Sequence, residues 1–324
     1  MANVPVRSPR YYNVFGGESL MRDGAVLEMR NISKFFPGVK ALQNVDFTLC
    51  EGEIHALMGE NGAGKSTLIK VLTGVYAKDS GDIYLRGYEN AVAIRSPQDA
   101  QNLGISTVYQ EITLCPNLSV AENMFIGRGN GTIQNWKEMN EAAGKILESL
   151  DIPAKPTQQL ASCSIAIQQM VAIARAVDME CKVLILDEPT SSLDEQEVAK
   201  LFKLMRELKA KGVGIIFVTH FLDQVYEVCD KITVLRDGKL VGEYVIEDLP
   251  RVQLVSKMLG KDLDDLSDIK SESAPYEGKD ADELVFEAEG LSSTEGIKPF
   301  DFKIRKGEVN GFTGLLGSGR SECV

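Results

Sequence analysis

Apolar residues recur along the chain at two spacings, one typical of strands and the other typical of helices. Short runs rich in β-branched and apolar residues, among them VLEMRNISKFF, are bounded by Pro-Gly and Glu-Gly turn signals and predict strands. Directly after a glycine-rich loop, apolar residues recur at helical spacing: Leu68, Ile69, Leu72 and Val75. A second helical pattern, over 195–211, leads into the apolar run GVGIIFVTH. Helix followed by strand, repeated, predicts a mostly parallel sheet covered on both faces.

Two stretches depart from this alternation. GDIYLRGYENAVAI, which follows the first helix, predicts a short antiparallel element. The region 115–160 has a distinct, helical character, and its longer helix is expected to carry Met139, Ala143, Ile146 and Leu150 on one side.

The composition changes along the chain in a way that predicts separate segments. Residues 1–21 lack the apolar core of a signal peptide and are expected to be a disordered leader, with Met21 as a candidate true start. Residues 22–260 form the main predicted domain. The segment 261–283 is acidic, contains a proline and has few large apolar side chains, which predicts a linker. Residues 284–324 are the predicted start of a second domain, cut short.

That second domain is predicted from an internal repeat. KGEVNGFTGLLGSGRSE aligns with EGEIHALMGENGAGKST, so that Glu308 falls over Glu53 and Arg320 over Lys65 at one constant offset. Self-similarity over such a distance indicates a repeat of domain size.

Charge and hydropathy exclude several classes of protein. The 324 residues carry a formal net charge of -12, which argues against a general nucleic-acid binder because phosphate backbones are held by clustered Lys and Arg. No run approaches the ~20 apolar residues that a membrane span needs. If the protein acts at a membrane, we expect it to do so as a peripheral subunit bound to a partner. The six cysteines form no C-x-x-C pair and are interpreted as reduced core thiols.

The stretch GENGAGKS has the pattern G-x-x-x-x-G-K-S between a predicted strand and a predicted helix. Glycines let successive backbone N–H groups face phosphate oxygens without a side-chain clash. Lys65 would reach the β- and γ-phosphates, and Ser66 would offer its hydroxyl to Mg²⁺. The alternative is a tight strand–helix turn with an exposed lysine. The predicted nucleotide-contacting residues of this loop are Gly59, Asn61, Gly62, Ala63, Gly64, Lys65, Ser66 and Thr67.

The second motif is VLILDEP, an apolar run that would form a buried strand ending in two carboxylates. Asp187 is expected to hold Mg²⁺, and Glu188 to polarise the water that attacks the γ-phosphate. The alternative is a solvated acidic turn, which is a weak reading when a phosphate loop precedes it in the same α/β domain.

With these motifs in place, residues 22–260 resemble the nucleotide-binding domain of ABC transporters. The resemblance implies an α/β P-loop NTPase fold: a mostly parallel sheet core, an antiparallel β subdomain and an inserted helical subdomain over about 111–175. It further implies that Gln110 in STVYQ touches Mg²⁺ and reports to the membrane partner, and that SSLD, residues 191–194, is the D-loop. His220 in FVTH matches the switch histidine that hydrogen-bonds the γ-phosphate; taken alone it would be interpreted as a satisfied residue at a strand end, and the other motifs favour the switch histidine instead.

By its offset from the phosphate loop, Phe36 is similar to the aromatic residue of this family that stacks on adenine. A plain core role for Phe36 is the alternative, with Phe35 as the rival for the stacking position.

The resemblance narrows to the ATPases of monosaccharide importers of the ribose/galactose/xylose type. FFPGVKAL, LCPNLSVAENMFIGR and QQMVAIARA are similar to that group, and GLLGSGRSE, residues 314–322, matches the degenerate phosphate loop of its second domain. The resemblance implies an ATP-hydrolysing subunit, peripheral on the cytoplasmic face of the cell membrane, that uses ATP and Mg²⁺. The resemblance implies three partners: transmembrane permease subunits, a second nucleotide-binding domain and, indirectly, an extracellular or periplasmic sugar-binding protein. The permease subunits would dock on residues 111–127. Nucleic acid is not among the implied partners.

One stretch departs from the family pattern. The signature motif L-S-G-G-Q is replaced by CSIAI, in which only Ser164 is retained. Since the two domains of such ATPases stack head to tail, CSIAI would face the second phosphate loop, where Arg320 replaces the lysine. We therefore expect a single hydrolytic site. Two alternatives remain: a nucleotide-binding module with little turnover, and a soluble ABC protein of the translation-factor or repair type.

Overall fold

The computed structural model describes residues 21–109, 114–127, 135–260, 284–292 and 298–312. The chain divides into two compact units, Met1–Lys261 and Asp262–Val324. The predicted leader and linker, the predicted Mg²⁺ contact Gln110 and the second phosphate loop over 314–322 all lie outside the described residues.

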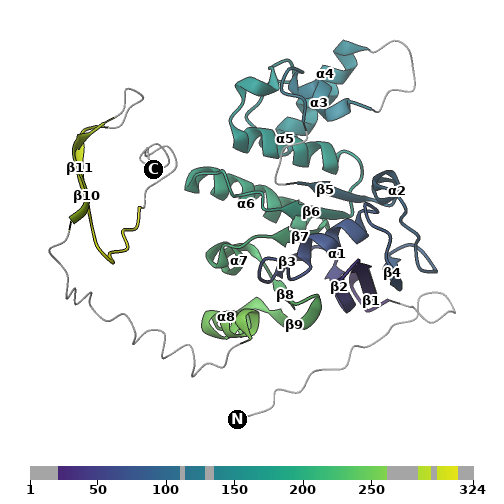
Figure 1. The fold of residues 1–324 in the computed structure, drawn as a ribbon. Helices are drawn as coiled ribbons and strands as arrows, with labels where there is room; N and C mark the ends of the chain where they lie inside the picture. The colour runs from purple at the N-terminus through teal and green to yellow at the C-terminus, as the bar shows by residue number, and fades with distance from the viewer. Residues whose placement is uncertain (1–20, 110–113, 128–134, 261–283, 293–297, 313–324) are drawn as a thin grey trace. The chain divides into compact units, whose positions relative to one another are not determined.

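The first unit is built on a six-stranded sheet with the order β5-β6-β7-β3-β8-β9 (Figure 1). Neighbouring strands from β5 to β8 are parallel, and β9 joins the edge antiparallel to β8. The prediction of a mostly parallel sheet is confirmed. The strands are β3 (Ile54–Met58), β5 (Ile105–Val108), β6 (Val183–Asp187), β7 (Gly214–Val218), β8 (Lys231–Arg236) and β9 (Lys239–Val245).

A second, antiparallel sheet has the order β2-β1-β4. Its strands are β1 (Ala25–Phe36), β2 (Val39–Cys50) and β4 (Ser80–Leu85). Apolar residues of β1 and β2 lie in one core cluster with the helix α1 (Lys65–Leu72) and one face of the parallel sheet. Of the predicted antiparallel stretch GDIYLRGYENAVAI, only the part in β4 is a strand, and β4 pairs antiparallel with β1.

Alternate residues of β6 enter two different cores, which shows how the sheet is covered on both faces. Val183 and Ile185 belong to the cluster around α1, whereas Leu184 and Leu186 belong to the cluster of the helices that follow β5. All four side chains are fully buried. A strand buried on both faces is a continuous apolar run, as VLIL is in the sequence.

The helices α3 (Val120–Phe125), α4 (Trp136–Ser149) and α5 (Ile165–Val177) gather at one end of the unit, away from β1 and β2 (Figure 1). Their buried side chains share one cluster with α6 (Glu195–Ala210). On α4 the buried residues are Met139, Ala143 and Leu147; the predicted Ile146 is half-buried and packs against the same cluster, which also contains Leu150. The remaining helical elements are α2 (Pro97–Asn102), α7 (Leu222–Val228), α8 (Arg251–Leu259), η1 (Leu160–Ser162) and η2 (Ile246–Asp248).

Two of these helices begin at a capping box, in which side chain and backbone satisfy each other's hydrogen bonds. At α3, Ser119 accepts from the backbone N–H of Glu122, whose carboxylate accepts from the N–H of Ser119. At α6, Asp194 and Glu197 form the same pair. Local sequence therefore determines where these helices start.

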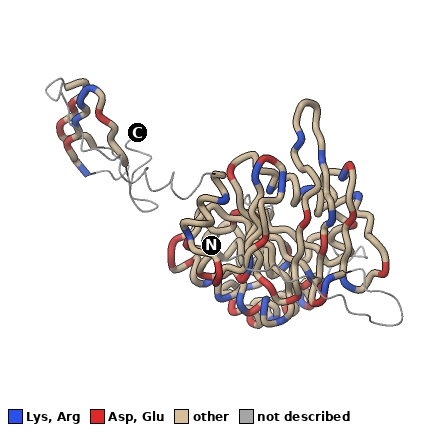
Figure 2. Tube along the Cα trace, turned by 90° about the horizontal axis from the view of Figure 1, so that it is seen from below, with Lys and Arg blue, Asp and Glu red and all other residues tan. Residues whose placement is uncertain are grey.

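The described part of the second unit is an antiparallel pair of strands, β10 (Leu284–Leu291) and β11 (Phe300–Arg305). Most of its side chains are exposed. Among the described residues of the chain, no helix is long and apolar enough to cross a bilayer. In the view of Figure 2, acidic and basic residues are interspersed along the trace of the first unit.

Candidate functional site

A cleft of about 580 Å³ lies where β3, β6 and β7 end. Because these strands are parallel, their carboxyl ends meet at one edge of the sheet, which is where open α/β sheets bind ligands. The volume falls within the range of small-molecule sites. The lining residues are Phe36, Val39, Lys40, Ala41, Asn61, Gly62, Ala63, Gly64, Lys65, Ser66, Thr67, Asp187, Glu188, Val218 and Asp237.

Glycine is required twice in the loop between β3 and α1. Gly59 has φ +153°, and a Cβ there would lie 2.2 Å from the carbonyl oxygen of Leu235. Gly64, directly before α1, has φ +105°, and its Cβ would lie 2.8 Å from the carbonyl oxygen of Ala41. A side chain at either position would push the loop away from the strands that support it. The glycine pattern therefore matches the backbone, with the loop wrapped closely against β2 and β8.

Lys65 opens α1, and its half-buried side chain folds over the loop. The ammonium donates hydrogen bonds to the carbonyl oxygens of Gly59, at 2.7 Å, and Glu60, at 3.0 Å. Burial lowers the pKa of Lys65, while the nearby carboxylates of Glu188 and Asp187 act in the opposite direction. The Lys65 ammonium therefore lies at the amino end of α1. The helix dipole is positive at this end, so the ammonium and the dipole both favour an anion here.

Asp187 is the last residue of β6, and Glu188 follows it into the cleft. Burial, and then the charge of Glu188, raises the pKa of Asp187; Lys65 and Lys70 lower it. Glu188 has φ +47°, an unusual conformation for a residue with a side chain, and its backbone N–H donates to the carbonyl oxygen of Val218 at 2.9 Å. Such strained backbone is typical of functional sites, where the surrounding structure enforces it.

His220 follows β7, and its Nδ1 lies 3.6 Å from Oε1 of Glu188. Its side chain is 59% exposed, and its ring lies against that of Phe221 with the centroids 4.1 Å apart. The structure therefore brings His220 to the same edge as Glu188, and its exposure differs from that of a buried residue at a strand end.

Of the two candidate aromatic residues, Phe36 lines the cleft and Phe35 does not. Phe36 is half-buried, and its ring meets that of Tyr76 edge to face at 5.2 Å. Phe35 is 46% exposed.

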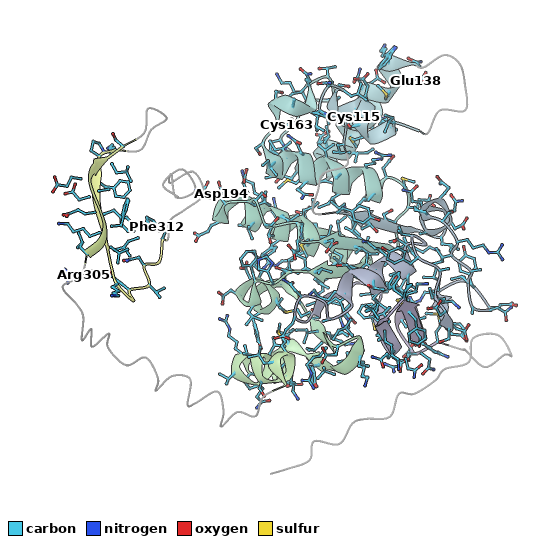
Figure 3. All side chains as sticks on the ribbon, in the orientation of Figure 1. Cys115, Glu138, Cys163, Asp194, Arg305 and Phe312 are labelled. Carbon is cyan, nitrogen blue, oxygen red and sulfur yellow. The ribbon has the colours of Figure 1, made fainter. Side chains whose placement is uncertain are left out.

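The departure from the family signature lies at the start of α5. Ser164 caps this helix by accepting from the backbone N–H of Ile167 at 3.4 Å, and Ile165 beside it is 47% exposed. Figure 3 marks Cys163, just before this helix, and Asp194, the cap of α6. Both segments begin helices of the first unit, and neither lines the cleft.

Some lining residues were absent from the predictions. Val39, Lys40 and Ala41 come from the start of β2, and Asp237 comes from the turn between β8 and β9. In that turn, Gly238 accepts a hydrogen bond from the N–H of Gln43 and donates one to the carbonyl oxygen of Ala63. The Asp-Gly turn signal was visible in the sequence, but its position against the loop depends on the strand order.

The family model described as "ABC transporter" matches residues 42–191. Residues 42–191 therefore carry an ABC transporter domain. The ABC match includes the loop from Gly59 to Thr67 and both carboxylates of the cleft.

Curated relatives agree with the predicted resemblance. The galactofuranose transporter ATP-binding protein YtfR of Escherichia coli K12 is 52% identical over 302 residues, which cover 92% of this chain and 59% of the relative. The fructose import ATP-binding protein FruK of Bifidobacterium longum is 50% identical, with 92% and 58% covered. Ribose import ATP-binding protein RbsA 1 of Rubrobacter xylanophilus is 45% identical. The chain spans about three fifths of the length of these relatives.

Solved structures agree with the fold. A structure of the ADP conformation of MJ1267, an ATP-binding cassette of an ABC transporter, superposes with a TM-score of 0.66 at 27% identity, covering 73% of this chain and 97% of that one. A nucleotide-free ATP-binding cassette gives a TM-score of 0.61 at 29% identity, with 68% and 91% covered. The predicted P-loop fold of the ABC type is confirmed.

Proposed function

We propose that this ABC chain is an ATP-hydrolysing subunit that energises the import of a monosaccharide. The observation that carries the proposal is the convergence, at one edge of the sheet, of the phosphate loop with Asp187, Glu188 and His220. Each of these groups has a separate part in binding or cleaving a nucleoside triphosphate.

The nucleotide lies along the cleft from Phe36 to Lys65. The adenine ring stacks on Phe36, which forms one wall. Backbone N–H groups of the loop and of the start of α1 face the phosphates, and the Lys65 ammonium leaves the loop carbonyls for the β- and γ-phosphate oxygens.

Mg²⁺ fits the oxygen donors of this cleft. The hydroxyl of Ser66 and the carboxylate of Asp187 line it together, and Gln110 is the third proposed contact. The described residues contain no group of three or more His, Cys, Asp or Glu that would form an all-protein cage. This suits a cation that takes one or two protein oxygens and completes its shell with water and phosphate. Once bound, Mg²⁺ would neutralise charge on the phosphate oxygens.

Glu188 accepts a proton from the water that attacks the γ-phosphorus, and the bond from this phosphorus to the bridging oxygen breaks. His220, 3.6 Å from that carboxylate, hydrogen-bonds the γ-phosphate and orients it toward the water. The chemistry is mainly positioning and charge stabilisation, since phosphoryl transfer needs little else from a protein.

The relatives support the substrate class. Their names specify galactofuranose, fructose and ribose, which differ as sugars and share the class of monosaccharide. We propose that the chain acts peripherally on the cytoplasmic face of the membrane, bound to transmembrane permease subunits through 111–127 and indirectly served by a sugar-binding protein. The sugar is selected by those partners.

The second partner is another nucleotide-binding domain, stacked head to tail on the first. At the start of α5, Ile165 and Ala166 stand where the family signature has its two glycines, and Ile167 stands where it has glutamine; the bulky Ile165 and Ile167 are poorly suited to approach a phosphate. They would face a phosphate loop that carries Arg320. The single hydrolytic site is therefore the one built on Lys65, and the other domain supplies its signature.

Nucleotide binding by the purified chain tests the first step. We expect a fluorescent ATP analogue to bind the chain with micromolar affinity in the presence of Mg²⁺, and Lys65→Ala to weaken it by at least about tenfold. Adding a complete second domain should then raise turnover. Equal binding by the chain and Lys65→Ala would contradict the proposed site; binding without turnover in the extended form would instead favour a nucleotide-binding module.

A further inference from the structure

The turn that carries Glu188 and the turn that carries His220 are joined by one side chain, Gln224. Its carboxamide oxygen accepts a hydrogen bond from the hydroxyl of Thr190 at 2.7 Å. The same oxygen accepts a second one from the hydroxyl of Thr219 at 3.3 Å. Both threonines are buried, with exposures of 4% and 3%, so these hydrogen bonds are shielded from water.

The two threonines are close neighbours of the proposed reacting groups. Thr190 lies two positions after Glu188, and the intervening Pro189 restricts the backbone between them. Thr219 directly precedes His220, and its hydroxyl also accepts from the backbone N–H of Phe221 at 3.1 Å. A shift of either threonine is therefore passed on to one of the two side chains.

Gln224 is itself held by a rigid element. It lies in the first turn of α7, and the next residue, Val225, is fully buried in a core cluster with side chains of β3 and β8. Gln224 does not line the cleft. Its hydrogen bonds therefore connect a fixed helix to both turns without contact with the nucleotide site.

We infer that Gln224 is a positioning residue. Its two hydrogen bonds, to Thr190 and Thr219, fix the turns that carry Glu188 and His220 and so keep these two side chains at their separation; we call this pair of hydrogen bonds the clamp. The inference rests on the proposed function for its catalytic consequence only. Glu188 needs such support because its backbone has φ +47°, a conformation that persists only where the surroundings enforce it. A displacement of about 1 Å at a catalytic group can lower a rate by as much as about 100-fold.

The clamp is tested in the whole chain with Gln224→Leu, which removes the acceptor at similar size, and Gln224→Glu, which keeps an acceptor for both hydroxyls. Thr190→Val and Thr219→Val each remove one donor. Glu227→Leu, at an exposed position of the same helix, is the matched control. Amide hydrogen exchange is followed by mass spectrometry in peptides covering 187–193 and 219–224, with melting temperatures measured alongside.

We expect Gln224→Leu to speed exchange at least about fivefold in both peptides, with α1 and the control unchanged, and Gln224→Glu to restore the parent's rates. Where the parent turns over ATP, Gln224→Leu should lower kcat about tenfold or more and leave KM within about twofold. Unchanged exchange in either peptide, or equal effects of the Leu and Glu variants, would overturn the clamp. A parent without nucleotide binding would refute the proposed function, whereas the exchange data would still decide the clamp.

Discussion

Oε1 of Glu188 and Nδ1 of His220 lie 3.6 Å apart, although they come from different βα connections. Their proximity follows from sheet register. Asp187 is paired with Val218 across the parallel strands β6 and β7, so the residues that follow both strands emerge at the same edge. The phosphate loop after β3 emerges there too, because β3 is the next strand of the sheet. A parallel sheet thus assembles one site from segments far apart in the sequence.

The first prediction concerns the wall of the cleft at Phe36. Phe36→Ala should weaken binding of an ATP analogue about tenfold, since stacking on a base is worth ~1–3 kcal/mol by alanine substitution. Phe35→Ala is the control, because Phe35 lies outside the cleft, and its affinity should stay within about twofold of the parent's. Fluorescence titration measures both; a larger loss for Phe35→Ala would assign the stacking role to Phe35.

The second prediction separates two reasons for glycine in the phosphate loop. At Gly59 a Cβ would collide with the carbonyl oxygen of Leu235, so Gly59→Ala should destabilise the protein by about 3 kcal/mol or more. At Gly62 the φ is +84° but no atom lies within 4 Å of a Cβ, so Gly62→Ala should cost only about 1 kcal/mol. Urea denaturation measures both, and equal costs would argue against close packing of the loop.

The third prediction concerns Asp187, whose pKa is raised mainly by burial. The carboxylate of Asp187 therefore binds a proton more readily in the native state than in the unfolded state. The stability from this group is therefore present below the ordinary value of 3.8 and is lost as the pH rises through the raised pKa. At neutral pH the ionised carboxylate opposes folding, so Asp187→Asn should raise the Tm of the nucleotide-free protein by about 2 °C or more.

The same variant should lose the extra thermal stabilisation that ATP gives in the presence of Mg²⁺ over ATP with a chelator. Differential scanning fluorimetry reads both effects. A lower Tm for Asp187→Asn without nucleotide would contradict the assignment of Asp187 as a residue kept charged for function.

The fourth prediction uses a buried ion network at the opposite ends of the strands. Glu53 accepts from Nδ1 of His55 at 2.6 Å and pairs with Lys231 at 3.2 Å. Burial alone would raise the pKa of Glu53, but the hydrogen bond and charge of His55, with the charge of Lys231, lower it to about 2. The stability from Glu53 is therefore present above the ordinary value of 4.5 and is lost as the pH falls through about 2.

We expect Glu53→Gln to lower the free energy of unfolding by about 2–3 kcal/mol at neutral pH, with the difference shrinking toward about pH 2.5. Urea denaturation across this range measures it. Glu51→Gln, at an exposed neighbouring position, should show little change at any pH. If the difference in free energy of unfolding between the parent and Glu53→Gln stayed constant with pH, the destabilisation would come from packing instead of ionisation.

Much of the site could be predicted from sequence because its chemistry lies in short motifs. The run from Gly59 to Thr67 and the pair Asp187 and Glu188 combine residue types and spacing that few other functions require. The structure places 61–67 and both carboxylates around one cleft, whereas the predicted contact Gly59 does not line it. The strand character of VLIL was also evident, since a strand buried on both faces is apolar at every position.

Strand order and the contacts between turns could not be predicted in this way. The entry of Lys40 and Asp237 into the cleft depends on how β2 and β8 lie beside the loop, which no local pattern specifies. The same holds for Gln224, which meets Thr190 only because α7 packs behind two adjacent strands. On α4, periodicity found the buried face, to which Ile146 contributes a half-buried side chain, but it missed the buried Leu147, because the packing of neighbouring helices determines how the helix is rotated.

The central claim is tested most directly by ATP turnover of the chain extended by a complete second domain, beside its Glu188→Gln variant. The carboxamide keeps the size of the side chain and cannot accept the proton from water. The account predicts turnover at least about 100-fold lower in Glu188→Gln, with nucleotide affinity within about twofold of the parent's. Turnover in Glu188→Gln equal to that of the parent would contradict the site proposed here.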